Sequence, residues 1–246
     1  MQIFSRVEEL ELLRRRLAGR KSTLVHGPSG AGKTLLLLEV LPEFSNVLYC
    51  ASSHSAQGVF RCLAEHLKQR DDATVKRICK GDTASLLLKS AISIKGIILD
   101  AFREAKYMVV LDHMNRPSQA FAAMVREIMF STSTPVIAVA RSAHMEDAGF
   151  VLPLLNDRSE KVAIKNFDPE TAAMFAQQVC RERTIGAVNL EVIISNILRA
   201  SEGNPGAILR MLEMASQSKY RTAEDQVKWA PLYIDFRMEW ASANAV

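Results

Sequence analysis

A glycine-rich segment holds the residues best suited to chemistry. Gly27, Gly32, Lys33 and Thr34 have the spacing G-x-x-x-x-G-K-[ST] of a P-loop. Its glycines let successive backbone N–H groups turn toward phosphate oxygens, and the positive end of the following helix strengthens that attraction. A lysine at this position reaches the β- and γ-phosphates, and the next hydroxyl holds Mg²⁺. The pattern therefore predicts a site for the phosphates of a nucleotide.

The sequence on either side of this loop is what a P-loop requires. An apolar run of strand length precedes it, and a leucine-rich segment predicted to be helical follows it to about Leu41. The alternative is a degenerate loop that binds only a structural phosphate. The residues expected to contact the nucleotide here are Gly27, Pro28, Ser29, Gly30, Ala31, Gly32, Lys33, Thr34 and Leu35.

A second segment places an acid directly after a predicted buried strand. Residues 108–111 are apolar and Asp112 follows them. In P-loop proteins this arrangement, called Walker B, puts the carboxylate beside Mg²⁺. The alternative is a carboxylate that only caps the turn after the strand. With the P-loop upstream, we expect Thr34 and Asp112 to be the metal ligands.

Composition limits the kind of protein that this chain can be. Its 246 residues are 48% hydrophobic, enough for one large domain or two small ones with a substantial core. The first residues do not resemble a secretion signal, and no apolar run approaches the ~18 residues of a membrane span. The four cysteines form no C-x-x-C pair. We expect a cytoplasmic protein with reduced thiols and no membrane partner.

The net charge of +4 is mild. Basic clusters are typical of solvated helix faces, but they also occur where a protein tracks a nucleic-acid backbone. DNA therefore stays open as a partner. The clusters are Arg14–Arg16, Lys76 with Arg77 and Lys80, and Lys219 with Arg221.

Alternating elements predict an α/β fold. Strand-like apolar runs are separated by segments of helical periodicity, which indicates a parallel sheet covered on both faces. Ligands bind such sheets at the carboxyl ends of the strands, where the P-loop, Asp112 and Arg141 all fall. One helical segment, 84–106, contains Gly96 and could be broken there. The predicted strands are 22–26, 47–51, 107–111, 135–140 and 161–164.

The pattern changes after residue 166, where only helices are predicted. Residues 1–165 are expected to form the core domain, 166–221 a small helical domain, and 222–246 a tail. The tail carries an aromatic stripe, and Pro231 argues that any helix there begins at that residue. The stripe either docks on the same chain or serves a protein partner or self-association. It consists of Trp229, Tyr233, Phe236 and Trp240.

With these residues placed, the sequence resembles the P-loop ATPases of the AAA+/STAND superfamily. Four blocks carry the resemblance: residues 4–10, similar to the box that packs around adenine, then 27–34, 109–112 and Gly203-Asn204-Pro205. The last is similar to the motif that opens a lid helix, whose proline faces the base. The resemblance implies ATP or ADP with Mg²⁺, a three-layer fold with sheet order 5-1-4-3-2, and a helical lid. It adds Phe4, Arg6 and Pro205 as nucleotide contacts.

The same resemblance implies a catalytic set and shows one departure from it. Arg141 stands where STAND proteins carry an arginine that senses the γ-phosphate, so the set is Lys33, Asp112, His113 and Arg141. Many AAA+ members have Glu after the Walker B acid to activate water, whereas this chain has His113. Imidazole can accept a proton near neutral pH. The alternative, which we favour, is that His113 is not the base and hydrolysis is slow. Arg158 is a poor match for an arginine acting in trans.

Three functions fit this sequence. The first is an ATP-dependent regulatory switch with slow hydrolysis. The second is a DNA-associated helper ATPase of the replication-initiation or transposition type, which predicts stimulation by DNA and salt-sensitive binding. The third, a small-molecule kinase, fits the loop but lacks an arginine-rich phosphate lid.

Overall fold

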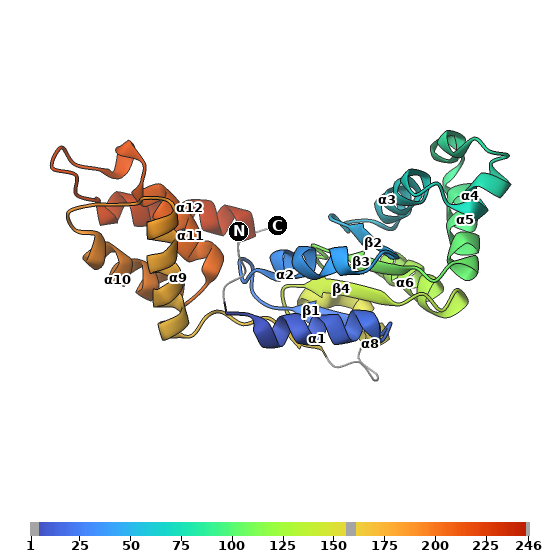
Figure 1. The fold of residues 1–246 in the computed structure, drawn as a ribbon, viewed down its shortest axis with the longest axis horizontal. Helices are drawn as coiled ribbons and strands as arrows, with labels where there is room; N and C mark the ends of the chain where they lie inside the picture. Colours follow the sequence, from blue (N-terminus) through green and yellow to red (C-terminus); the bar gives the residue numbers. More distant parts are fainter. Residues whose placement is uncertain (1–4, 156–160, 245–246) are drawn as a thin grey trace. The chain divides into compact units, whose positions relative to one another are not determined.

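The computed structural model describes residues 5–155 and 161–244, which divide into two compact units (Figure 1). The sheet unit comprises the described parts of residues 7–27 and 33–163. The helical unit comprises those of 1–6, 28–32 and 164–246. The residues of the P-loop are thus shared: 28–32 make their contacts within the helical unit, whereas Gly27 and Lys33 make theirs within the sheet unit.

The sheet unit contains five parallel strands among the described residues, in the order β2-β3-β4-β1-β5. This confirms the predicted order 5-1-4-3-2. The register pairs Cys50 with Leu111, and His26 with Ala140, so the strands end side by side. The bounds are β1 Thr23–His26, β2 Val47–Cys50, β3 Met108–Leu111, β4 Val136–Ala140 and β5 Val162–Ala163.

Helices connect these strands. In Figure 1, α3, α4 and α5 (cyan to green) form one group, of which α3 packs with β2. The helices are α1 Val7–Ala18, α2 Lys33–Val40, α3 Ala56–Gln69, α4 Ala73–Ile78, α5 Ala91–Glu104, α6 Gln119–Ser131, α7 Met145–Ala148 and α8 Leu152–Leu155. Short 3-10 turns are η1 Leu41–Glu43, η2 Thr83–Leu88 and η3 Gly149–Val151.

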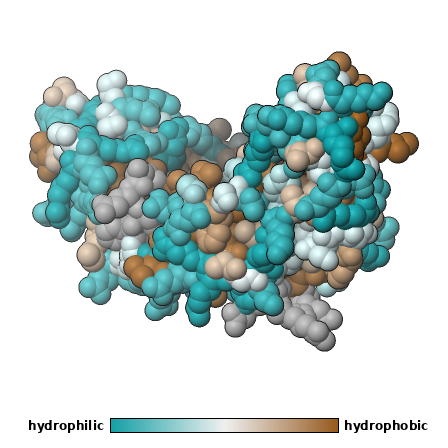
Figure 2. Space-filling model, turned by 45° about the vertical axis from the view of Figure 1, so that its right-hand side comes forward, coloured by the Kyte–Doolittle hydropathy of each residue, from teal (hydrophilic) through white to brown (hydrophobic). Residues whose placement is uncertain are grey.

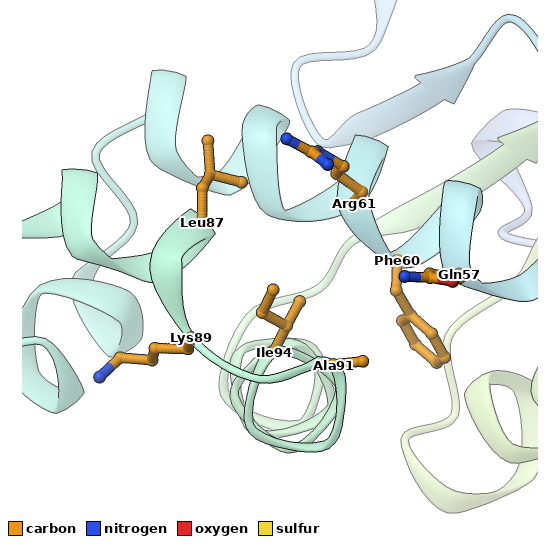
Figure 3. Close-up of a pocket in the computed structure, with 7 residues that line it drawn as sticks. All are labelled: Gln57, Phe60, Arg61, Leu87, Lys89, Ala91 and Ile94. Atoms are coloured by element: carbon orange, nitrogen blue, oxygen red, sulfur yellow. The ribbon is translucent and has the colours of Figure 1, made fainter.

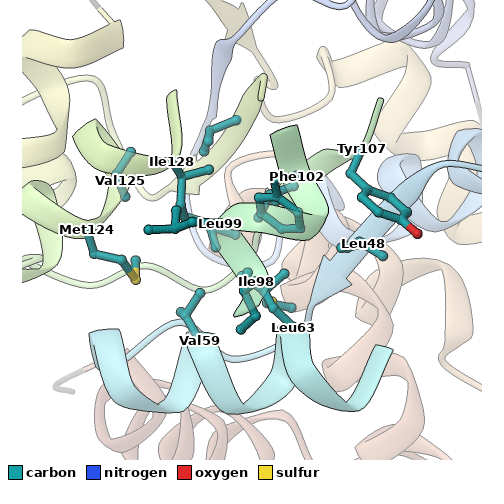
Figure 4. Close-up of a cluster of buried hydrophobic side chains, with 14 of the residues drawn as sticks. Leu48, Val59, Leu63, Ile98, Leu99, Phe102, Tyr107, Met124, Val125 and Ile128 are labelled. Atoms are coloured by element: carbon teal, nitrogen blue, oxygen red, sulfur yellow. The ribbon is translucent and has the colours of Figure 1, made fainter. Parts of the chain in front are cut away.

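Helix α5 passes through Gly96 without a break, contrary to the possibility raised by the sequence. The face of α5 that carries Ile98 and Phe102 is buried against α3 and α6, as Figure 4 shows. A glycine inside a helix costs only ~1 kcal/mol relative to alanine. Burying two large side chains contributes more than that, at about 1.5–3 kcal/mol each, so packing keeps the helix continuous.

The helical unit is built from α9 Pro169–Glu182, α10 Leu190–Ser201, α11 Pro205–Ala215 and α12 Trp229–Asn244, with the 3-10 turn η4 Ser218–Tyr220. Helices α9 and α11 both start with proline after a capping side chain, Asp168 or Asn204, which accepts a backbone N–H of the first turn. Leu232 and Phe236 of α12 are buried in the core shared with α11. The aromatic tail therefore packs on its own unit.

Helix α12 begins at Trp229, two residues earlier than Pro231 suggested. A proline in the first helical turn removes an N–H that has no partner within the helix anyway, so it does not fix the first residue.

Hydrophilic residues cover most of the face drawn in Figure 2, where hydrophobic residues form separate smaller areas. Within the described part of the chain, no helix is both long and apolar enough to cross a membrane.

Candidate functional site

The P-loop connects β1 to α2. Gly30 and Gly32 have φ values of +79° and +95°, in the left-handed region where other residues are strained. Apart from Gly32 itself and its two chain neighbours, no atom lies within 4 Å of the position that a Cβ of Gly32 would take. The backbone at Gly32 is therefore not covered by a side chain of its own unit. A phosphate group needs an uncovered backbone in order to approach it.

Lys33 is partly buried at the start of α2. Its Nζ donates a hydrogen bond to the carbonyl oxygen of Gly27 at 2.6 Å. Burial lowers the pKa of Lys33 to about 8; the nearby Arg141 acts in the same direction, while Asp112 opposes both. An anion bound here would favour the charged form and raise this pKa.

Thr34 and Asp112 lie in direct contact. The Thr34 hydroxyl donates to Asp112 Oδ2 at 2.8 Å, and the His113 backbone N–H donates to Oδ1 at 2.7 Å. The Asp112 side chain is only 1% exposed. A hydroxyl and a carboxylate are hard oxygen ligands, the kind that Mg²⁺ takes together with phosphate oxygens and water. The two residues thus fit the predicted metal role.

The described residues contain no cluster of three or more His, Cys, Asp or Glu side chains able to hold a metal alone.

Tyr49 is a site residue that the sequence analysis missed. Its hydroxyl donates to Asp112 Oδ2 at 2.7 Å, so one carboxylate oxygen accepts from both Tyr49 and Thr34. Burial and this hydrogen bond raise the pKa of the Tyr49 hydroxyl. The one available signal was a phenol inside an apolar strand, one residue before the end of β2.

His113 has a left-handed backbone, with φ of +52°, and its side chain is 63% exposed. Its Nε2 lies 3.4 Å from the Thr34 hydroxyl and 3.8 Å from Asp112 Oδ2. The imidazole thus faces the two predicted metal ligands.

Arg141 follows β4, and the sheet register brings it near the P-loop. Ala140 pairs with His26, so β4 and β1 end at the same level of the sheet. The next residue is Arg141 after β4 and Gly27 after β1. Arg141 is partly buried and close enough to Lys33 to lower its pKa. An anion bound beside these two cations would neutralise their charge.

Residues 28–32 of the P-loop make their contacts within the helical unit. Asn204 Nδ2 donates to the Ser29 carbonyl at 2.8 Å, and the Gly206 N–H donates to the Gly30 carbonyl at 3.0 Å. A Cβ on Gly30 would lie 2.5 Å from Asn204 Oδ1 and 2.9 Å from the Trp240 ring. Glycine is required at position 30 by space as well as by φ.

The other residues with a role predicted from the sequence lie outside the contacts described so far. Arg6 is buried, donates to the Lys165 carbonyl at 2.6 Å and lies over the Phe167 ring at 4.5 Å. Pro205 is the first residue of α11, directly after Asn204, and Leu35 is exposed in the first turn of α2. Phe4 and Arg158 lie outside the described residues.

A pocket of about 140 Å³ lies between α3, η2 and α5 (Figure 3). Its lining contains none of the predicted site residues. The side chains around it are Gln57, Phe60, Arg61, Leu87, Lys89, Ala91 and Ile94.

Solved structures of known proteins share this fold, although no protein-family model matches the chain. A Walker-type ATPase of Pyrococcus abyssi has a TM-score of 0.60 and 18% identity, over 85% of this chain and 67% of that one. The ORC1 protein of Aeropyrum pernix, solved in complex with DNA, has a TM-score of 0.64 and 16% identity, over 97% of this chain and 66% of that one. A Pyrococcus horikoshii STAND protein with a tetratricopeptide repeat sensor has a TM-score of 0.56 and 16% identity, over 96% of this chain and 32% of that one.

These similarities define the class of fold. The chain has the three-layer fold of the P-loop NTPases, with the strand order that the resemblance implied. It spans about two thirds of the length of two of these proteins and about a third of the STAND protein.

The lowered pKa of Lys33 predicts a specific pH dependence of stability without nucleotide. The folded-state pKa of about 8 lies below the usual value of 10.5, so between these values the unfolded chain binds more protons. The unfolding free energy should therefore rise with pH across this window, by up to about 1.4 kcal/mol per pH unit. Urea unfolding of wild type and Lys33→Met from pH 7 to 10 measures the difference. If the unfolding free energies of wild type and Lys33→Met differ by the same amount at every pH, the lowered pKa of Lys33 is contradicted. That constant difference is the result expected for the exposed control Lys21→Met.

Proposed function

We propose that this protein binds ATP and ADP with Mg²⁺ and acts as a nucleotide-dependent switch that hydrolyses ATP slowly. The observation that carries the proposal is the hydrogen bond between Thr34 and Asp112, next to a partly buried Lys33 at the start of α2. A hydroxyl, a carboxylate and an amine in this arrangement match the needs of a metal-bound triphosphate.

Each residue has a role in this proposal. The backbone of 27–35 holds the phosphates, Lys33 neutralises their charge, and Thr34 and Asp112 hold Mg²⁺. Arg141 senses the γ-phosphate. Phe4, Arg6 and Pro205 contact the base.

The switch role is supported by how the loop residues divide. Residues 28–32 are held by Asn204 and Gly206 within the helical unit, whereas Lys33 and Thr34 bind Gly27 and Asp112 within the sheet unit. A ligand that contacts the whole loop acts on both sets of interactions. The division into a core at 1–165, a lid at 166–221 and a tail at 222–246 belongs to the proposal.

A DNA-associated helper ATPase is the second candidate, since one of the similar structures is an ORC1 protein in complex with DNA. All three basic clusters contain ion pairs: Arg14 with Glu43, Lys76 with Asp71, Arg77 with Glu104, Lys219 with Asp235, and Arg221 with Asp225. Paired cations are less available to phosphates, so we rank this candidate second. ATP turnover that DNA stimulates, with binding that weakens steeply as salt rises, would reverse the ranking.

A protein partner or self-association also belongs to the proposal, in a reducing compartment such as the cytoplasm. We do not place that surface on the aromatic stripe, because Phe236 is buried and Trp229, Tyr233 and Trp240 pack on the helical core. All four cysteines are free in the structure, as a reducing compartment allows.

Lys33→Ala tests nucleotide binding directly. Removing the amine should nearly abolish ATP affinity in calorimetry, while circular dichroism stays unchanged because Lys33 supports no buried core. Lys21→Ala, an exposed lysine just before β1, is the matched control and should bind normally. Undiminished binding by Lys33→Ala would refute the site.

Arg141→Ala tests which phosphate the arginine reads. Losing one charge-assisted contact should weaken ATP by about 1.5–3 kcal/mol and leave ADP nearly unchanged. Titrations of both nucleotides, with exposed Arg126→Ala as control, give the comparison. Equal losses for ATP and ADP would make Arg141 structural.

His113 should explain slow turnover. An Asp112 carboxylate beside a metal is a poor base, and a neutral imidazole offers one acceptor only. A positioned base is worth roughly 10²–10⁴ in rate. In a phosphate-release assay, His113→Glu should therefore raise turnover and His113→Ala change it little. If His113→Ala abolishes turnover with ATP affinity intact, His113 is the base.

A further inference from the structure

Two cysteines and a histidine meet at the outer edge of the sheet, next to the candidate site. Strand β2 is the edge strand, and α3 runs beside it. The His66 Nε2 lies 2.8 Å from the Tyr49 carbonyl oxygen, and the Cys62 Sγ lies 3.9 Å from the same oxygen. These side chains stand one helical turn apart on α3, so both reach the carbonyl that β2 leaves without a strand partner.

The Cys50 and Cys62 thiols also lie close enough to shift each other's pKa. Cys50 is the last residue of β2 and directly follows Tyr49, whose carbonyl oxygen lies 3.9 Å from the Cys62 Sγ. A disulfide requires two such neighbouring thiols to approach to bonding distance. Cys62 is partly exposed, whereas Cys50 is 0% exposed. A reagent from solution therefore meets Cys62 first.

The surroundings favour a thiolate at Cys62. The pKa of the Cys62 thiol lies well below its usual range. The interaction with Cys50 lowers it most and His66 lowers it further, while burial and the neighbouring Glu65 act in the opposite direction. The hydrogen bond to Cys62 raises the pKa of His66, while burial and Arg70 oppose it. A thiolate beside an imidazolium is the reactive form of cysteine.

We propose that Cys62 is an oxidation site for hydroperoxides and that Cys50 is its resolving thiol. The Cys62 thiolate attacks the peroxide O–O bond, takes one oxygen as sulfenic acid and releases the other, protonated, as water or alcohol. The Cys50 sulfur then attacks the Cys62 sulfur, the S–O bond breaks, and the hydroxyl leaves as water with the Cys50 proton. The peroxide receives the two electrons that the thiols lose in forming the disulfide.

This site is connected to Asp112 by hydrogen bonds. The Asp112 backbone N–H donates to the Cys50 carbonyl at 3.0 Å, and Tyr49, next to Cys50, donates to the Asp112 carboxylate. A disulfide that moves Cys50 therefore displaces groups that hold Asp112. Reduced Mg²⁺-ATP affinity on oxidation is the expected consequence, and this consequence rests on the proposed function.

The pH profile of alkylation tests the thiolate. With iodoacetamide and peptide mapping of the wild type, the rate at Cys62 should change little from pH 6 to 8, because the reactive form is already present. An ordinary thiol gains about tenfold per pH unit over this range. His66→Gln should restore part of that dependence at Cys62. A tenfold rise per unit at Cys62 in the wild type would overturn the proposal.

Hydrogen peroxide tests the disulfide, read by intact mass and by mapping. Wild type should lose two hydrogens and link Cys50 to Cys62, reversibly with dithiothreitol. Cys50→Ser should stop at a sulfenic acid on Cys62 that dimedone traps, Cys62→Ser should show neither product, and buried Cys79→Ser should behave as wild type. First oxidation at Cys79 or Cys180, or no link between Cys50 and Cys62, refutes the site.

The consequence for the nucleotide is measured separately. Oxidised wild type should bind Mg²⁺-ATP at least tenfold more weakly than the reduced protein, and peroxide-treated Cys50→Ser should lose less. An unchanged affinity with the disulfide formed refutes the connection to Asp112 but not the oxidation site. If the reduced protein binds no ATP, the proposed function fails while the mass result still decides the chemistry.

Discussion

The burial of the Asp112 carboxylate constrains the whole sheet unit. A carboxylate that is 1% exposed must be fully hydrogen-bonded, because an unsatisfied buried charge costs several kcal/mol. Its donors come from different segments: Tyr49 from β2, Thr34 from α2, and the backbone of His113 from the turn after β3. A one-residue slip of β2 against β3 would place the Tyr49 side chain elsewhere and remove a donor. The acid that suits a metal site thus also fixes the register around it.

Parallel pairing explains why the sequence located most of this site. Because the carboxyl ends of parallel strands share one edge of the sheet, a residue directly after an apolar run is placed without knowledge of its contacts. Asp112 and Arg141 were found in this way, and the loop at 27–34 by its own spacing. The strand order itself came from the resemblance, since alternating strands and helices are compatible with several orders.

Where the sequence failed, long-range packing decided the outcome. Gly96 allowed a break in α5, but the buried face of that helix outweighs the local cost of glycine. Tyr49 lies in an apolar run whose other members pack in the core, and only its partner 63 residues away distinguishes it. The contacts of Cys62 and His66 with the edge of β2 depend in the same way on where α3 lies, which no local pattern contains.

Gly30 and Gly32, the two P-loop glycines with a left-handed backbone, show what a sequence motif predicts about a residue and what it leaves out. The spacing predicts Gly32, whereas Gly30 stands at a position that the motif leaves free, although both need a left-handed backbone. The structure separates them: no side chain of its own unit covers Gly32, whereas Gly30 lies against Asn204 and the Trp240 ring. A side chain at Gly32 strains the loop alone, while one at Gly30 must also displace α11 and α12 within the helical unit. One of these glycines leaves its backbone uncovered, and the other ties the loop to the helices around it.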